Sequence, residues 1–142
     1  MISLARPRDD AGKILDRTSG EMEKAKILVV DDDPLIAMNT ADMLADLGHV
    51  VIEANSGASA LNILKSEDGI HLLITDYSMP RMNGVELATA AQEIRPSLAI
   101  LIATGYAELP AGSDPGLPRI SKPYGQAQLS VAVEKILATR AR

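Results

Sequence analysis

The hydrophobic residues of this chain fall into short runs, which alternate with longer stretches whose apolar positions recur every three or four residues. Four of the runs are apolar at almost every position, which is typical of strands buried on both faces of a parallel sheet. Their alternation with helical stretches predicts a doubly wound α/β fold with a five-stranded parallel sheet. The predicted strands are 27–30, 50–52, 72–75, 99–103 and a short, more polar one at 119–121.

Helix signals flank the stretches between the runs. Asp33 followed by Pro34 predicts an N-cap and a first helical residue, and Gly48 ends that helix. Ser56 caps the second helix, and Gly84 opens the third. The apolar faces predicted for the four helices are Ile36, Met43, Leu44 and Leu47; Ala60, Leu61 and Leu64; Leu87, Ala91 and Ile94; and Leu129, Val133, Ile136 and Leu137.

The segment between Thr104 and Lys122 departs from this alternation. It contains Pro110, Pro115 and Pro118 together with several glycines. In a helix interior, proline costs about 3 kcal/mol and glycine about 1 kcal/mol. We therefore predict that a fourth helix is short here or is replaced by a loop.

Residues 1–24 differ in composition from the rest of the chain. They carry mixed charges, with Gly12 and Gly20 as breakers and Ile14-Leu15 as the apolar pair between them. This composition predicts a flexible N-terminal arm over residues 1–24 and a single domain over residues 25–142. A short docking helix around residues 13–18 is the alternative for the arm.

The composition narrows the classes of function. The net charge is −5 and no stripe of Lys and Arg interleaves with aromatic residues, which argues against a nucleic-acid surface. The cysteine count of 0 excludes disulfides, a thiolate nucleophile and cysteine-based metal sites. Phe and Trp are absent, so the core must be aliphatic. The apolar runs are too short to span a membrane and the N-terminus lacks a signal-peptide core, so a cytoplasmic location is expected.

Carboxylates follow two of the predicted strands. Asp31 and Asp32 come directly after the first strand, and Asp76 follows the third. In the flavodoxin-like strand order 2-1-3-4-5, these two strands are neighbours, and ligands bind beyond their carboxyl ends. Crowded carboxylates repel each other by roughly 1–4 kcal/mol per pair. Such a cluster therefore indicates a site that binds a cation or takes part in proton or phosphoryl transfer. Thr104 and Lys122 follow the fourth and fifth strands and belong to the same edge.

Four segments in this order resemble the receiver domains of two-component response regulators. Each segment is a weak motif by itself, but all four together at strand ends are specific. The resemblance covers residues 25 to about 138. The third segment further resembles a subgroup of single-domain receivers from alphaproteobacteria with a Phe-Ala-Thr-Gly-type motif, with Ile102 in the place of Phe. The segments are Val30-Asp31-Asp32-Asp33-Pro34, Asp76 to Gly84, Ala103-Thr104-Gly105-Tyr106 and Ser121-Lys122-Pro123-Tyr124.

The resemblance implies that Asp76 is a phosphoacceptor. Asp76 stands alone at its strand end and is free to attack phosphorus, whereas the pair Asp31 and Asp32 suits a metal. The family's metal ligands correspond to Asp31, Asp32, Asp76 and the backbone carbonyl of Ser78, which implies Mg²⁺ or Mn²⁺ as cofactor. The implied activity is self-catalysed phosphorylation and dephosphorylation, not that of an enzyme.

The resemblance also implies a switch next to the phosphoacceptor. Thr104 and Lys122 would contact the phosphoryl group, and Thr104, Gly105 and Tyr106 would move with it. The bond between Lys122 and Pro123 is expected to be cis. Receivers carry an aromatic residue three positions before the lysine, but here that position is Arg119, so Tyr106 is the candidate to replace it.

The resemblance implies a class of partner, and two alternative functions stay open beside it. The expected partner is a histidine kinase or a histidine phosphotransfer protein, the chain is expected to be a monomer, and no output domain is expected after Arg142. One alternative is a haloacid-dehalogenase-like phosphatase using Asp31 and Asp33, against which Leu35 stands where that family expects Thr or Val. The other is an idle pseudo-receiver that only binds. His49 and His71 lie at strand starts, away from the carboxylates, and are expected to be structural or exposed.

Overall fold

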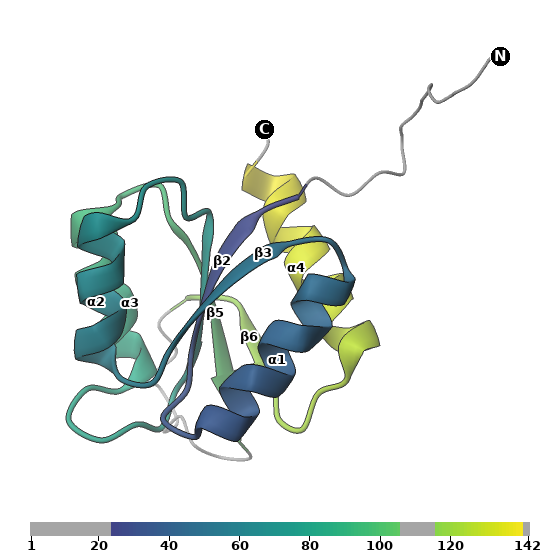
Figure 1. The fold of residues 1–142 in the computed structure, drawn as a ribbon, viewed down its shortest axis with the longest axis horizontal. Coiled ribbons are helices and arrows are strands. Elements are labelled where there is room, and N and C mark those ends of the chain that lie inside the picture. Colours follow the sequence, from purple (N-terminus) through teal and green to yellow (C-terminus); the bar gives the residue numbers. More distant parts are fainter. Residues whose placement is uncertain (1–23, 106–115, 141–142) are drawn as a thin grey trace, which may run out of the picture.

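The computed structural model describes residues 24–105 and 116–140, which form a parallel sheet with helices on both faces (Figure 1). The strand order is β3-β2-β4-β5-β6, which is the predicted order 2-1-3-4-5. All four strand pairs are parallel, so the predicted fold class is confirmed. The strands are β2 (Lys26–Val30), β3 (Val50–Ala54), β4 (Leu72–Asp76), β5 (Ala99–Thr104) and β6 (Arg119–Ser121). The helices are α1 (Pro34–Asp46), α2 (Gly57–Ser66), α3 (Gly84–Ile94) and α4 (Gln126–Arg140).

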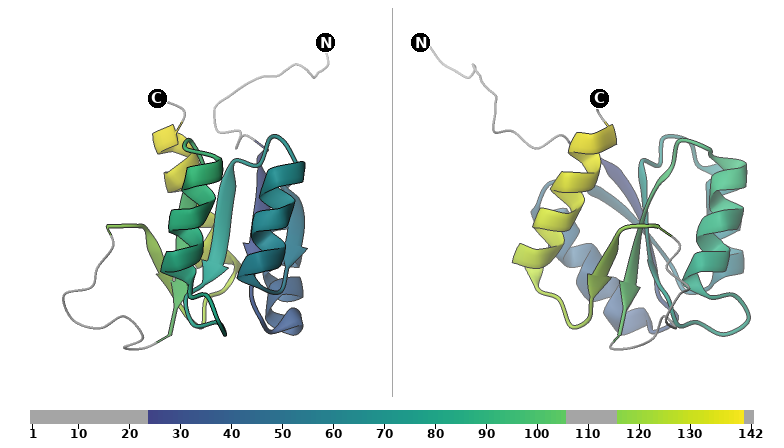
Figure 2. Two further views of the ribbon diagram at one scale, coloured as in Figure 1. Left: turned by 90° about the vertical axis from the view of Figure 1, so that its left-hand side faces the viewer. Right: turned by 180° about the vertical axis from the view of Figure 1, so that it is seen from behind.

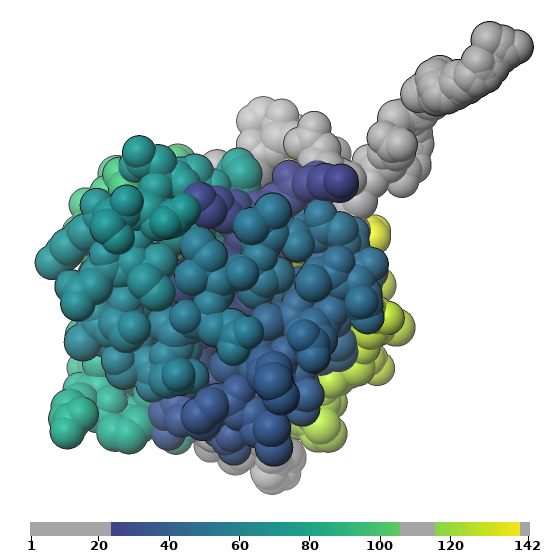
Figure 3. Space-filling view, viewed as in Figure 1, coloured from purple at the N-terminus to yellow at the C-terminus, as the bar shows by residue number. Residues whose placement is uncertain are grey.

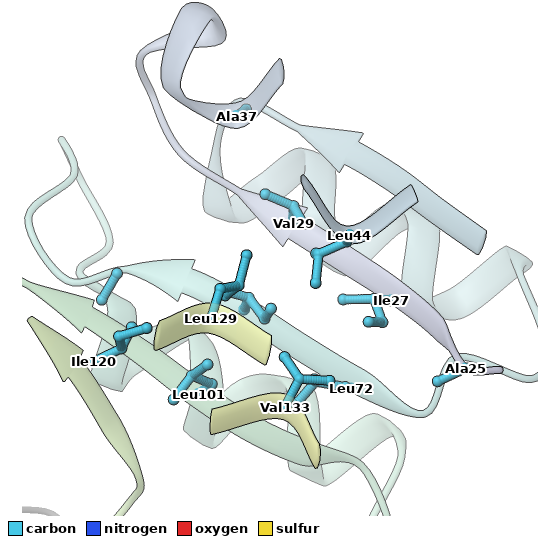
Figure 4. Packing of buried hydrophobic residues seen from close by; sticks show 12 residues of the cluster. Ala25, Ile27, Val29, Ala37, Leu44, Leu72, Leu101, Ile120, Leu129 and Val133 are labelled. Atoms are coloured by element: carbon cyan, nitrogen blue, oxygen red, sulfur yellow. The ribbon is translucent and has the colours of Figure 1, made fainter. Parts of the chain in front are cut away.

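The sheet separates two aliphatic cores. Helices α1 and α4 cover one face and α2 and α3 the other, as the side views show (Figure 2). Because side chains alternate along a strand, Ile27 and Val29 enter the first core while Leu28 and Val30 enter the second. Figure 4 shows the first core, where Leu129 of α4 packs over the strands.

The predicted inward face of α1 was partly wrong. Ile36 is exposed, and so are Leu35 and Met38, on a helix that contributes to the molecular surface in the space-filling view (Figure 3). The buried positions of α1 are Ala37, Thr40, Ala41 and Leu44. Apolar residues lie on both sides of this helix, so their periodicity did not show which side is buried. Small residues such as Ala37 and Ala41 face the sheet, where the helix backbone lies close to the strands. Leu44, Met43 and Leu47 do pack on the core as predicted.

Both histidines anchor strand β2 and its entry. The backbone N–H of Ala25 donates to Nδ1 of His49 at 3.0 Å, and that of Lys26 donates to Nδ1 of His71 at 3.0 Å. These contacts confirm a structural role at the edge of the sheet opposite the carboxylates.

Three predictions fall on residues outside the described ranges. They are the arm over residues 1–24, of which residues 1–23 lie outside; the short or missing fourth helix, which concerns residues 106–115; and the switch position of Tyr106. No helix within the described residues is long and apolar enough to cross a membrane.

Candidate functional site

The predicted carboxylates meet at the carboxyl edge of the sheet. Asp76 is the last residue of β4, and Asp31 directly follows β2, whose Val30 is in register with Thr75. One carboxylate oxygen from each of Asp31, Asp32 and Asp76 lies within 4.8 Å of the other two. Asp31 and Asp76 are buried, with 4% and 5% of their surface exposed, whereas Asp32 is exposed. The site is therefore a pair of buried carboxylates with a third at its mouth.

Lys122 brings a positive charge to the same point. Its Nζ lies 2.7 Å from Oδ1 of Asp76 and 3.6 Å from Oδ2 of Asp31. The backbone holds it there, because its N–H donates to the carbonyl of Thr104 at 2.8 Å, next to the register pair Thr104–Ser121. The Lys122–Pro123 bond is cis, as predicted.

Thr104 closes the edge from β5. It is the last residue of that strand and only 9% exposed, and it lies beside Asp76 through the pairing of Asp76 with Ala103. Gly105 follows it immediately. Arg119, which takes the place of the expected aromatic residue, is exposed at the start of β6.

The loop after β4 carries Ser78, the predicted carbonyl ligand, two residues beyond Asp76 and exposed. Its course depends on Gly84, the first residue of α3, whose N–H donates to the carbonyl of Tyr77 at 2.8 Å. A Cβ atom at Gly84 would lie 2.6 Å from the carbonyl oxygen of Asp76. Sequence reasoning identified Gly84 as a helix start but missed this close approach, which depends on tertiary structure.

Asp31 is held by contacts that the sequence did not reveal. Its carbonyl accepts a hydrogen bond from the side chain of Asn55 at 3.1 Å, and its Oδ1 accepts one from the N–H of Asp33 at 2.9 Å. The side chain of Asp33 accepts from the N–H of Leu35 at 3.0 Å and caps α1, as predicted. Asp33 therefore belongs to the helix end and lies outside the cluster of three carboxylates.

The electrostatics of the pocket favour a bound cation. Burial raises the pKa of Asp31 above its ordinary value, and the hydrogen bond from Asp33 only partly opposes this; Asp76 raises it further, and Lys122 lowers it. Two buried carboxylates and an exposed one face a single ammonium in the described part of the site. Carboxylate and carbonyl oxygens are the ligands that Mg²⁺ prefers, and one or two carboxylates suffice for it. The donor set therefore fits a hard divalent cation.

Comparisons with known proteins agree with this geometry. The family model of the response regulator receiver domain matches residues 27–134. The chain is 37% identical over 116 residues to the response regulator receiver protein CpdR of Brucella abortus, covering 79% of this chain and 96% of that protein. It is 31% identical over 120 residues to the sensor kinase CckA of the same organism, covering 80% of this chain but 12% of the kinase. A crystal structure of a receiver domain protein from Clostridium thermocellum superposes with a TM-score of 0.75 at 29% identity, over 82% of this chain and 97% of that one.

Proposed function

The chain belongs to the response regulator receiver domains, and on that premise we propose that Asp76 is its phosphoacceptor. The observation that supports this assignment is the contact of Asp76 with Lys122 at 2.7 Å inside a cluster of three carboxylates. Asp76 combines a buried carboxylate, a neighbouring cation and a position at the end of a central strand.

In the proposed reaction, a carboxylate oxygen of Asp76 attacks the phosphorus of the donor. The new O–P bond forms as the bond from phosphorus to the donor breaks, and the donor's leaving atom keeps that electron pair. For a phosphohistidine donor the leaving group is imidazole, and for acetyl phosphate it is acetate. The product is an acyl phosphate on Asp76. Such transfers depend mainly on alignment and on neutralising the phosphoryl oxygens.

The residues of this chain divide these tasks. Asp31, Asp32 and Asp76 with the carbonyl of Ser78 would hold Mg²⁺ or Mn²⁺, which supplies charge neutralisation when bound. Lys122 pairs with Asp76 before transfer and is close enough to pair with a phosphoryl oxygen afterwards. Thr104 is the last residue of β5, with Gly105 next to it, and its hydroxyl would contact the phosphoryl group on Asp76.

The donor is proposed to be a histidine kinase or a histidine phosphotransfer protein. The match to a segment of a sensor kinase supports this class of partner, because the chain shares its sequence pattern with a protein of the same signalling chemistry. Phosphorylation would then change a protein-interaction surface, either as the output of a single-domain regulator or as a phosphate sink. Turnover is self-catalysed, with no other substrate.

The phosphatase alternative is not favoured. It requires Asp33 as an acid–base group beside Asp31, but the Asp33 carboxylate accepts the N–H of Leu35 as a helix cap. An idle pseudo-receiver is also disfavoured, because Asp31, Asp32, Asp76, Thr104 and Lys122 all lie at one edge of the sheet.

Intact-mass analysis with acetyl phosphate and Mg²⁺ tests the proposal. The wild type should gain one phosphoryl group, Asp76→Asn none, and EDTA should prevent labelling. Asp33→Asn is the matched control, because asparagine is an equally good N-cap, and it should be labelled like the wild type. Labelling of Asp76→Asn at the wild-type rate, or loss of labelling in Asp33→Asn with its fold intact, would contradict the assignment.

A further inference from the structure

The hydroxyl groups of Tyr124 and Thr40 meet at 2.7 Å and join the segment after β6 to helix α1. Thr40 lies on the sheet-facing side of α1 and is 2% exposed. Tyr124 is partly buried and packs its ring against the same core. The two residues are 84 positions apart in the sequence, so the contact exists only when the sheet has assembled both elements.

Thr40 differs in this contact from two other helical threonines. Thr89 donates its hydroxyl to the carbonyl of Val85 at 3.0 Å, and Thr139 donates to the carbonyl of Lys135 at 2.9 Å. Each of those hydroxyls is satisfied within its own helix, four residues back. The hydroxyl of Thr40 is instead satisfied across the fold by Tyr124. A buried hydroxyl that loses its partner is costly, so this pair resists separation.

Tyr124 lies two residues beyond Lys122, so its bond to Thr40 ties the segment that carries this lysine to α1. From the other side, the N–H of Lys122 donates to the carbonyl of Thr104. Helix α1 starts at its cap Asp33, directly after Asp31 and Asp32. The bond between Tyr124 and Thr40 therefore completes a ring that runs from the carboxylates through α1 to Lys122 and back to the carboxylates through its ammonium.

We propose that Tyr124, through the bond of its hydroxyl to Thr40, is a positioning residue that sets Lys122 for phosphoryl transfer to Asp76. This role rests on the proposed function of Asp76. Displacing a catalytic group by about 1 Å can cost about 100-fold in rate. Loss of the Tyr124 contact leaves the bond of Lys122 to Thr104 in place, so it should displace the lysine less and slow transfer by about 3- to 10-fold. Tyr124→Phe keeps the ring in the core, so it isolates the hydroxyl from the packing.

The first measurement is the rate of Asp76 phosphorylation by acetyl phosphate with Mg²⁺, followed by intact mass on the full chain. Tyr124→Phe and Thr40→Val should each be slower by about 3- to 10-fold. The double variant should be no slower than the slower single variant, because both changes remove the same bond. Thr89→Val is the matched control, since it makes the same hydroxyl-to-methyl change on α3, and its rate should equal that of the wild type.

A Lys122→Ala background separates positioning from general stability. If Tyr124 acts through Lys122, adding Tyr124→Phe to Lys122→Ala leaves the remaining phosphorylation rate unchanged. A merely structural hydroxyl lowers thermal stability but changes the rate by the same factor in both backgrounds. That result, or a wild-type rate for Tyr124→Phe, overturns the positioning role. A wild type that takes up no phosphoryl group refutes the proposed function instead, so the two failures are distinct.

Discussion

Gly84 lies against the backbone of Asp76, so that a Cβ atom on residue 84 would be 2.6 Å from the carbonyl oxygen of Asp76. The N–H of Gly84 also donates to the carbonyl of Tyr77. The start of α3 therefore lies against the backbone of both Asp76, the proposed phosphoacceptor, and Tyr77. The backbone of Asp76, not its side chain alone, is part of the site.

Gly84→Ala should lower both stability and phosphorylation. The added methyl group would overlap backbone atoms, which cannot move aside by a change of rotamer. The loop after β4 must therefore shift, which should lower the free energy of unfolding by about 1–3 kcal/mol. The rate of labelling with acetyl phosphate should fall as Asp76 shifts. Denaturant unfolding and intact mass on the same samples measure the two effects.

Gly57→Ala is the matched control for this change. A Cβ atom there would lie 2.6 Å from Sδ of Met82 and 3.2 Å from its Cγ and Cβ, so the closest overlap is with the flexible end of a side chain and not with backbone. The Met82 side chain can rotate away, so the cost should be smaller than for Gly84→Ala. Equal losses in the two variants would show that the approach to Asp76 has no special weight.

Lys122→Ala should separate the chemistry from cation binding. Its ammonium is the charged donor nearest to Asp76 in the described site, and removing such a donor typically slows transfer roughly 100-fold. Cation affinity should be retained or increase, because a positive charge leaves the neighbourhood of Asp31 and Asp76. Calorimetric titration with Mg²⁺ and the labelling rate give the two values, and Lys65→Ala on α2 is a control for loss of a lysine away from the site. Cation affinity that falls together with the rate would show that Lys122 mainly maintains the fold of the pocket.

The sequence predicted the sheet because its strands are apolar throughout, and strand order then brought Asp31 and Asp76 together. The same reasoning placed Lys122 and Thr104 at that edge, since each follows a neighbouring strand. It could not find Asn55, whose amide holds the carbonyl of Asp31, because that contact joins residues 24 positions apart.

Helix α1 shows a second limit of sequence reasoning. The larger apolar residue Ile36 was expected to be buried, yet Ala37 and Thr40 face the sheet. Polar pairs such as Thr40 and Tyr124 carry no periodic signal, because the assembled fold determines which residues meet.

Asp31→Asn should stabilise the protein when no cation is present. Burial raises the pKa of Asp31 above 3.8, so the folded state disfavours its ionised form. Asparagine keeps the oxygen that accepts the N–H of Asp33 and removes the repulsion from Asp76, which is worth roughly 1 kcal/mol. Unfolding free energies in EDTA should therefore be higher for the variant at neutral pH, while its Mg²⁺ affinity should be lower.

The pH dependence gives the sign of this effect. Between pH 3.8 and the raised pKa, the folded state binds more protons at Asp31 than the unfolded state does. The contribution of Asp31 to stability therefore falls as pH rises through that window and stays constant above it. The difference between Asp31→Asn and the wild type should grow over the same range. A constant difference from pH 4 to pH 8, or a less stable variant, would contradict this account.

His49 should make the opposite contribution to the pH dependence of stability. Burial lowers its pKa below 6.5, and the charge of Glu134 only partly opposes this. Its Nδ1 must stay unprotonated to accept the N–H of Ala25, the residue that leads into β2. The unfolded state therefore binds more protons below pH 6.5, so this contribution is complete above pH 6.5 and is lost as pH falls toward the lowered pKa.

His49→Asn offers an amide oxygen to the same N–H without a titrating group, so its unfolding free energy should vary less between pH 5 and pH 7 than that of the wild type. Denaturant unfolding across this range measures both slopes, and equal slopes would place the acid sensitivity in other groups.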